Sequence, residues 1–230
     1  MYSKVKLNHK GAIMLNMDFT KRVVVHTKEQ HWQVSPLPGV WRKLLARENS
    51  ESGHATSIVR YDAGASFRSH NHPLGEEIFV LSGTFSDETG DFPAGSYFRN
   101  PQGFVHAPFS DNGCELLVKL HQISPLDSQR ICIDTNQQSW QLGSNKLKVK
   151  PLHDFETESV ALILCPAGEK LTLPSDCSGV EIYVISGELN DELGRYPAGC
   201  WIRSSNLNQY RISAEQETLI WLKTGHFPDY

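Results

Sequence analysis

Three histidines and one glutamate in the first half of the chain have the residue types and spacing of metal ligands. His70 and His72 are separated by one residue, Glu76 follows after three more, and His106 comes shortly after the sequence Pro101-Gln-Gly103. Imidazole nitrogens combined with a carboxylate favour Zn, Fe, Mn, Ni or Cu over Mg or Ca. These side chains therefore predict one divalent transition metal, with Zn as the first choice and Fe, Mn or Ni as the alternatives.

Short strands could bring these four side chains together. Residues two apart on a strand point to the same face, so His70 and His72 can both enter one barrel interior. A Pro-Leu-Gly sequence after His72 favours a turn, which would place Glu76 at the start of the next strand. The glycines and proline before His106 predict a second turn that returns this histidine across the same sheet.

The two segments resemble the paired motifs of the cupins. From Gly64 to Gly83 the order is Gly, five residues, His-X-His, three residues, Glu, six residues and Gly. From Gly95 to His106 it is Gly, five residues, Pro-X-Gly, two residues and His. Ser110 replaces the final Asn of the second motif, which is not a metal ligand in that family. The resemblance implies the same four ligands as the spacing.

The sequence around both motifs is similar to the ChrR-type cupin, which includes the zinc-binding C-terminal domain of ChrR anti-sigma factors. The similarity is carried by His72–Gly83, Ser86–Glu88, Phe92–Gly95, Arg99–Pro101 and His106–Phe109. ChrR proteins also have an N-terminal anti-sigma domain with a CxxC zinc motif. This chain has no CxxC and no cysteine before Cys114. We therefore expect a ChrR-type cupin without that domain, and we do not expect it to bind a sigma factor in the usual way.

The chain is duplicated at an offset of 104 residues. Leu81-Ser82-Gly83 and Phe92–Gly95 reappear as Ile185-Ser186-Gly187 and Tyr196–Gly199. Each half has short segments rich in Val, Ile, Leu, Phe and Tyr between clusters of turn residues, which predicts strands. The predicted fold class is all-β: a bicupin of two tandem antiparallel jelly-roll β-barrels.

The duplication also predicts the domain boundaries. Residues 1–22 are expected to form an N-terminal extension and residues 23–122 a metal-binding barrel. A linker at 123–130 would lead to a second barrel at 131–230 that lacks the metal ligands.

The second half serves as an internal control for the ligand assignment. At the same offset the four predicted ligands are replaced by Pro174, Asp176, Val180 and Tyr210. Glu77 persists as Glu181 in that half, although no site is expected there. We therefore predict that Glu76 is the ligand and that Glu77 has a structural role.

Several other side chains are candidates for the surroundings of the metal. Arg68 is expected either to face the metal or to lie at a solvated rim, and Phe104 either to line a pocket or to pack in the core. Arg42 and Arg60 are further pocket candidates. The strand at 77–81 is apolar on both faces, which predicts packing against the twin barrel or another subunit, so a homodimer is one expected arrangement.

Composition excludes several partners. The formal net charge is −4 and no run of Lys or Arg exceeds two residues, so neither nucleic acid nor a membrane is expected as a partner. The five cysteines form no CxxC pair, which predicts reduced thiols in a cytoplasmic protein. No signal peptide or membrane span is expected.

Three functions remain open at this point. The resemblance favours a sensory or regulatory module that binds a metal and a small molecule. A site with open metal positions would also suit a non-haem dioxygenase that cleaves a small ketone or diketone. The third alternative is a metal-stabilised storage or binding protein without turnover. The sequence leaves any catalytic residues unknown, and no organic cofactor is expected.

Overall fold

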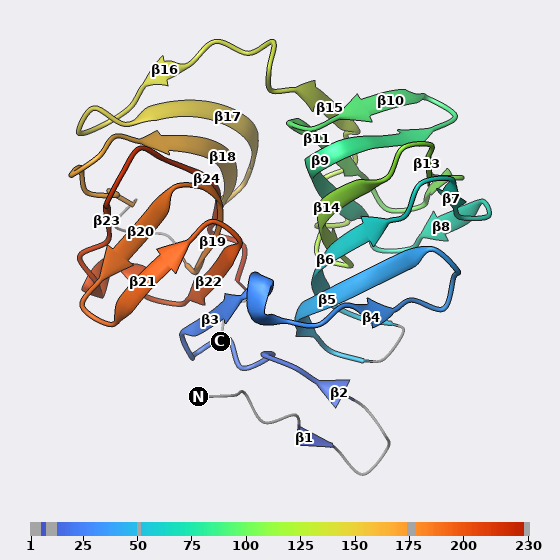
Figure 1. Cartoon of the computed structure of the whole chain (residues 1–230), viewed down its shortest axis with the longest axis horizontal. Helices are drawn as coiled ribbons and strands as arrows, with labels where there is room; N and C mark the ends of the chain where they lie inside the picture. Colours follow the sequence, from blue (N-terminus) through green and yellow to red (C-terminus); the bar gives the residue numbers. More distant parts are fainter. Residues whose placement is uncertain (1–5, 8–12, 50–51, 174–177, 228–230) are drawn as a thin grey trace. The chain divides into compact units, whose positions relative to one another are not determined.

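A computed structural model of the chain describes residues 6–7, 13–49, 52–173 and 178–227 (Figure 1). These residues form almost only β-strands, and their helices are two short 3-10 turns, η1 (Thr27–Glu29) and η2 (Leu207–Gln209). No helix among them is long and apolar enough to cross a membrane. The chain divides into two compact units, Met1–Met17 with His31–Gln137 and Asp18–Gln30 with Gln138–Tyr230. The predicted all-β bicupin fold is confirmed.

The first unit is built on a ten-stranded antiparallel sheet. Its strands are β4 (Gln33–Val34), β5 (Val40–Arg47), β6 (Ala55–Tyr61), β7 (Ala65–Ser66), β9 (Glu76–Asp87), β10 (Gly90–Pro93), β11 (Ser96–Asn100), β13 (Phe109–Ser110), β14 (Cys114–Leu120) and β15 (Ile131–Asp134). A separate pair is formed by β8 (His70–His72) and β12 (Phe104–His106), and another by β1 (Lys6–Leu7) and β2 (Ile13–Met14). Residues 1–5 and 8–12 of the predicted N-terminal extension lie outside the described residues.

Alternation along the strands creates the interior of the first unit. Val40, Ile78, Phe85 and Leu116 belong to one buried apolar cluster, although they come from three different regions of the chain. Because successive strand residues point to opposite faces, every second residue of β6, β9 and β14 is available for this interior. The sheet thus surrounds a core to which β8 and β12 add their histidines.

The second unit has a seven-stranded and a three-stranded sheet. The larger sheet contains β3 (Val23–His26), β16 (Gln141–Leu142), β17 (Lys148–Phe155), β18 (Glu158–Cys165), β19 (Val180–Ser186), β22 (Cys200–Ser204) and β24 (Thr218–Thr224). The smaller sheet contains β20 (Glu188–Asp191), β21 (Gly194–Pro197) and β23 (Ser213–Ala214). The four cysteines among the described residues, in both units, are free thiols.

Each unit contains one strand from the other half of the duplicated sequence. β3 pairs with β22 of the second unit, and β15 pairs with β11 of the first, as Figure 1 shows. Equivalent bonds fix both strands, since the Thr27 hydroxyl donates to Gly199 O (2.6 Å) and the Thr135 hydroxyl donates to Gly95 O (2.7 Å). The linker at residues 123–130 stays a prediction about where the two sequence repeats meet. In space, each compact unit contains the opening strand of the other repeat.

One glycine of the cupin motif is required by the close approach of two strands. Gly83 has a φ of +71°, and a Cβ placed on it would lie 2.1 Å from the carbonyl oxygen of Gly113. Gly64 has a similar φ of +77° but open space around its Cα. A side chain at either glycine would be strained by the left-handed backbone, whereas only a side chain at Gly83 would also clash with a neighbouring strand.

Replacing these glycines with alanine should separate the two costs. Gly64→Ala is expected to lower the free energy of unfolding by about 1–2 kcal/mol, the cost of an alanine in left-handed backbone. Gly83→Ala is expected to lower it by about 2 kcal/mol more, because strands must move apart. Urea denaturation of both variants measures the difference, and equal values would contradict the predicted clash.

Candidate metal centre

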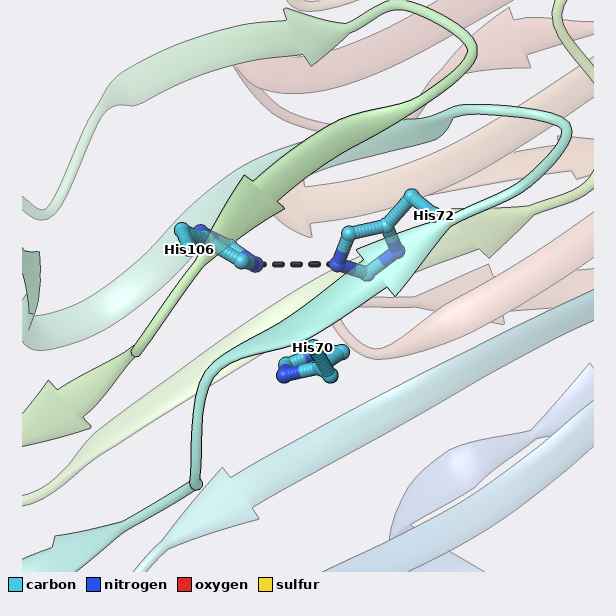
Figure 2. Close-up of side chains that lie close together, drawn as sticks. All are labelled: His70, His72 and His106. Atoms are coloured by element: carbon cyan, nitrogen blue, oxygen red, sulfur yellow. Dashed lines mark hydrogen bonds between the residues drawn. The ribbon is translucent and has the colours of Figure 1, made fainter.

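The three predicted histidines meet on two paired strands. In the antiparallel register of β8 and β12, His106 lies opposite His70, and Phe104 lies opposite His72. One ring nitrogen from each histidine lies within 4.8 Å of the others, and Nε2 of His72 is 2.9 Å from Nε2 of His106 (Figure 2). His70 is half-buried and the other two are buried. The strand β8 and the predicted turn before His106 thus place three imidazoles around one point.

Glu76, the first residue of β9, faces the same point. Its Oε2 is 3.5 Å from Nε2 of His72 and 3.5 Å from Nε2 of His106. The side-chain amide of Asn100 donates to that oxygen at 3.2 Å. The carboxylate is buried, with a residue exposure of 6%. The structure therefore brings the fourth predicted residue to the histidines, and its role as a ligand stays a prediction.

Burial sets the protonation of this cluster. It lowers the pKa of His72 to about 3, with further lowering by His70 and His121. Burial also lowers the pKa of His106, and it raises the pKa of the Glu76 carboxyl. The two buried histidines are therefore neutral, the form in which imidazole binds metals. A buried carboxylate is costly without a cation, so the donor set fits a divalent metal.

The low pKa of His72 makes the stability of metal-free protein depend on pH. His72 binds a proton near pH 6.5 when unfolded but only near pH 3 when folded. The unfolded state thus binds more protons between these values, and stability falls as the pH drops below 6.5. From pH 7 to 5, His72 is expected to remove about 2 kcal/mol from the free energy of unfolding.

A His72→Gln variant isolates this effect. The Glu76 carboxyl, whose pKa is raised, works in the opposite sense and is present in both proteins. Between pH 7 and pH 5, the free energy of unfolding of chelator-treated wild type should fall by about 2 kcal/mol more than that of the variant. Urea denaturation at the two pH values measures this difference. An equal loss in both proteins would show that His72 is not buried in neutral form.

A hydrogen-bond network that begins at the buried Asp87 supports His106 from its other side. Oδ2 of Asp87, at the end of β9, lies 3.2 Å from Nδ1 of His106, and the backbone N–H of Thr89 donates to the other carboxylate oxygen at 2.7 Å. Arg130 donates to the Thr89 hydroxyl (2.9 Å) and to Oδ1 of Asn100 (3.3 Å). A carboxylate on one imidazole nitrogen fixes the tautomer, which leaves Nε2 of His106 available to a metal.

Removing this carboxylate should weaken metal binding without removing a ligand. Asp87→Ala is expected to lower the affinity for metal about 10- to 100-fold, the usual effect of losing a partner that orients a ligand. The exposed Asp111→Ala is the matched control and should leave the affinity unchanged. Competition with a chromophoric chelator measures both. An unchanged affinity in folded Asp87→Ala protein would exclude the orienting role.

A cavity of about 210 Å³ adjoins the histidines. His70, His72 and Glu76 form part of its wall. The other lining side chains are mostly apolar and include Val59, Phe67, Ile78, Phe85, Leu116 and Val118. Arg42 and Arg47 are the arginines that line it. The predicted ligands thus border a cavity whose other walls are mostly apolar.

The structure separates the other predicted candidates. Arg42 lines the cavity, as predicted, whereas Arg60 lies over the ring of Trp32, at 4.6 Å from its centroid. Arg68 is exposed, which agrees with the rim alternative. Phe104 packs edge-to-face on His106, with ring centroids 5.4 Å apart, and carries Arg130 over its own ring.

Sequence reasoning missed several lining residues. Tyr61 and Phe67 line the cavity with their rings 5.5 Å apart, and Phe67 also packs against His70 at 5.5 Å. Phe67 has odd spacing from both histidines of β8, so strand parity did not place it with them. Tyr61 and Val59 could have been found from the alternation along β6, because residues two apart share a face.

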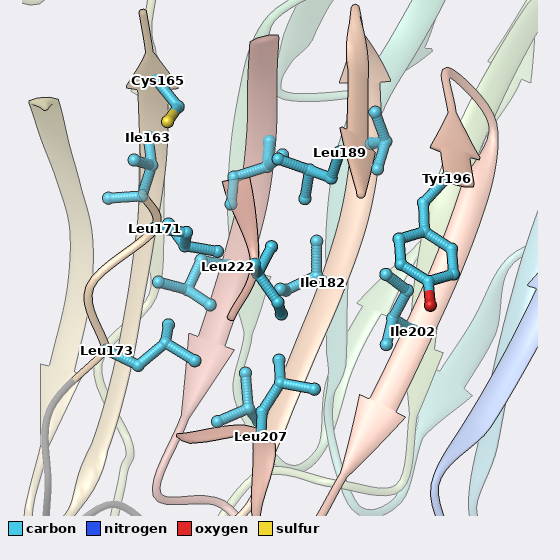
Figure 3. Packing of buried hydrophobic residues seen from close by; sticks show 14 of the residues in the cluster. Ile163, Cys165, Leu171, Leu173, Ile182, Leu189, Tyr196, Ile202, Leu207 and Leu222 are labelled. Carbon is cyan, nitrogen blue, oxygen red and sulfur yellow. The ribbon is translucent and has the colours of Figure 1, made fainter. Parts of the chain in front are cut away.

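The interior of the second unit has apolar packing at the corresponding positions. Val180 belongs to the same buried apolar cluster as Ile182, Ile202 and Leu222, and Tyr210 packs against that cluster. Figure 3 shows part of this packing. Pro174 and Asp176 lie outside the described residues. Among the residues that are described, His70, His72 and His106 form the one group of three or more His, Cys, Asp or Glu arranged to hold a metal.

These features define a bicupin whose first barrel holds a three-histidine site suited to a divalent metal. The chain belongs to the family of the ChrR Cupin-like domain, which matches it twice, over residues 20–124 and 128–228. The predicted duplication and the ChrR-type resemblance are thereby confirmed. No curated protein matches the sequence significantly.

Solved structures share this fold at low sequence identity. A candidate dioxygenase from Nostoc punctiforme superposes with a TM-score of 0.68, 17% identity, and coverage of 89% of this chain and 82% of that chain. The pirin YhhW from Escherichia coli, solved with nickel(II), superposes with a TM-score of 0.64 at 14% identity, covering 89% of this chain and 98% of that chain. A mutant of oxalate decarboxylase OxdC from Bacillus subtilis superposes with a TM-score of 0.60 at 12% identity, covering 88% of this chain and 76% of that chain. These likenesses concern the fold alone.

Proposed function

We propose that the first barrel binds one divalent transition metal, Zn first and Fe, Mn or Ni otherwise, through His70, His72, Glu76 and His106. The protein is then a sensory or regulatory module whose signal is a small molecule that reaches the metal. The observation that carries this proposal is the convergence of three imidazoles and a buried carboxylate beside a cavity of about 210 Å³. The family membership supports the regulatory part.

The second candidate is a metal-dependent dioxygenase that acts on a small ketone or diketone. It is favoured by the same cavity, because a bound metal would face a space that can hold a substrate. The apolar walls would exclude bulk water from that space, and His70, His72, Glu76 and His106 would hold the metal. Oxygen chemistry would then be supplied by the metal when it is bound.

Metal analysis and oxygen uptake distinguish the two candidates. The protein is purified without chelator, its metals are measured, and a second sample is loaded with iron under anaerobic conditions. About one Zn per chain and no oxygen uptake with a small β-diketone are expected for the sensor. Diketone-dependent uptake by the iron form, absent in His72→Ala protein, would overturn the sensor and support the dioxygenase.

A further inference from the structure

One arginine contacts the hydrogen-bond partners of two predicted metal ligands. Arg130 directly precedes β15, the strand that the second half of the duplicated sequence contributes to the first unit. Its Nε donates to Oδ1 of Asn100 at 3.3 Å, and its Nη2 donates to the hydroxyl of Thr89 at 2.9 Å. The guanidinium also lies over the ring of Phe104, at 4.6 Å from the centroid. These three contacts fix the position of the guanidinium.

The contact with Asn100 leads to Glu76. The amide nitrogen of Asn100 donates to Oε2 of Glu76 at 3.2 Å, while its oxygen accepts from Arg130. A side-chain amide that turns by 180° exchanges its donor for its acceptor. Asn100 is 0% exposed, so no solvent is present to satisfy the turned amide. Arg130 therefore favours the one orientation in which Asn100 can donate to Glu76.

The contact with Thr89 leads to His106. The Thr89 hydroxyl has a single hydrogen, and it donates to Oδ1 of Asp87 at 2.5 Å while its oxygen accepts from Arg130. The other oxygen of that carboxylate, Oδ2, lies 3.2 Å from Nδ1 of His106. Arg130 thus directs the hydroxyl toward the carboxylate that orients the imidazole.

The second unit contains the equivalent arginine beside a different set of partners. Arg22 precedes β3 as Arg130 precedes β15. Its Nη2 lies 2.5 Å from Oδ2 of Asp191, the equivalent of Asp87. Its guanidinium lies over the ring of Tyr210, at 4.1 Å from the centroid, and Tyr210 occupies the position of His106 in the repeat. In this unit the arginine pairs directly with the carboxylate.

In the first unit the arginine makes its hydrogen bonds elsewhere. Nη2 of Arg130 lies 4.0 Å from Oδ2 of Asp87, which is nearer to the imidazole of His106. The residues that accept from Arg130 are particular to the metal-binding half, because Asn100 is replaced by Ser204 in the repeat and Thr89 by Leu193. Both acceptors of Arg130 are thus present in the half with the predicted ligands and absent from the other half.

We propose that Arg130 is a positioning residue of the metal centre. It orients Glu76 through Asn100, and it orients His106 through Thr89 and Asp87. This inference rests on the proposed function, because that function makes Glu76 and His106 ligands. It adds that the second repeat supplies part of the support of the metal centre.

The sign of the effect distinguishes positioning from simple electrostatics. Loss of a positive charge near the site would by itself strengthen the binding of a cation. Loss of the bonds that orient ligands weakens metal binding, so Arg130→Gln is expected to lower the affinity about tenfold. Arg130→Lys keeps the charge but lacks the forked donors, and it is expected to lose about as much.

Cobalt(II) is the probe, because its visible absorption reports the geometry of its ligands as well as the amount bound. Chelator competition gives the affinity, and circular dichroism verifies folding. Both Arg130 variants should change the cobalt(II) spectrum. Arg22→Gln, the matched control, should keep the wild-type affinity and spectrum, although its urea midpoint falls because the buried Asp191 loses its partner.

An Asp87→Ala background separates the two connections. There, Arg130→Gln should still lower the affinity, since the connection through Asn100 to Glu76 remains. No further loss in this background would overturn the proposed connection to Glu76.

The outcomes separate this inference from the proposed function. Wild-type protein that binds no cobalt(II) would overturn the proposed function and the inference with it. If the wild type binds cobalt(II), an unchanged or higher affinity and an unchanged spectrum in folded Arg130→Gln protein would overturn the inference alone. Wild-type affinity in Arg130→Lys would do the same, because charge without the forked donors would then suffice.

Discussion

Protein with His72→Ala is expected to lose at least about 100-fold in metal affinity. Zinc bound by four ligands contributes about 10–16 kcal/mol, so one ligand accounts for about 3 kcal/mol on average. His72 is also central in the cluster, with its Nε2 near both His106 and Glu76. The metal content after purification should fall from about one ion per chain to a small fraction of that value.

Elemental analysis and chelator competition measure this loss. His31→Ala is the control, because His31 is an exposed histidine of the same unit and should leave the metal content unchanged. Circular dichroism verifies that both variants are folded. Stoichiometric metal in folded His72→Ala protein would mean that the ion is held elsewhere and that the predicted ligand set is wrong.

Replacing the adjacent Glu77 should have the opposite consequence. Glu77→Ala is expected to lower the free energy of unfolding by about 1–3 kcal/mol, because the buried Tyr97 hydroxyl and Arg99 lose a carboxylate partner while Arg99 keeps its ion pair with Asp127 at 2.7 Å. Oε1 of Glu77 lies 3.4 Å from Nη1 of Arg99 and accepts a hydrogen bond from the Tyr97 hydroxyl at 2.7 Å. Arg99 is 1% exposed, so water cannot replace the lost charge.

The experiment on Glu77 combines two readouts. Urea denaturation gives the stability, and metal analysis of the folded fraction should still give about one ion per chain. Glu217→Ala, at an exposed position, is the control and should change stability by less than about 0.5 kcal/mol. Loss of metal from folded Glu77→Ala protein, with stability intact, would reverse the roles predicted for the two neighbouring glutamates.

The structural role of Glu77 could be predicted because the duplication preserves it as Glu181, whereas the ligand role of Glu76 stays a prediction. The structure gives the physical reason. Glu181, the equivalent of Glu77, accepts a hydrogen bond from the indole of Trp201 at 2.7 Å, as Glu77 does from Tyr97. The pair at 97 and 201 obeys the repeat offset, so this buried contact belongs to the framework of both barrels.

The histidine cluster could be predicted because its geometry is local. His70 and His72 lie on one three-residue strand, and two turns of known residue type fix His106 and Glu76 relative to it. The contributions of Asp87 and Arg130 could not be predicted in this way. The position of Asp87 depends on where β9 ends, and the position of Arg130 depends on which barrel β15 joins. Residue spacing predicts neither of these.

The exchange of opening strands was not predictable for a related reason. Val23–Val25 and Ile131–Ile133 are both rich in β-branched residues and occupy equivalent positions in the repeat. Either segment satisfies the pairing and burial preferences of either barrel, so alternation alone gives no preference between them. Arg42 and Arg60 were likewise equal candidates until the register of β5 on β6 placed them on opposite faces.

The exchanged strands also make the duplication hard to reverse in evolution. A deletion of the second half would remove β15 and the edge it covers on β11, and a deletion of the first half would remove β3 in the same way. In chain order, β15 follows the rest of the first unit, whereas β3 precedes the rest of the second. The metal-binding barrel therefore depends on the opening segment of the other half, which covers the edge of β11.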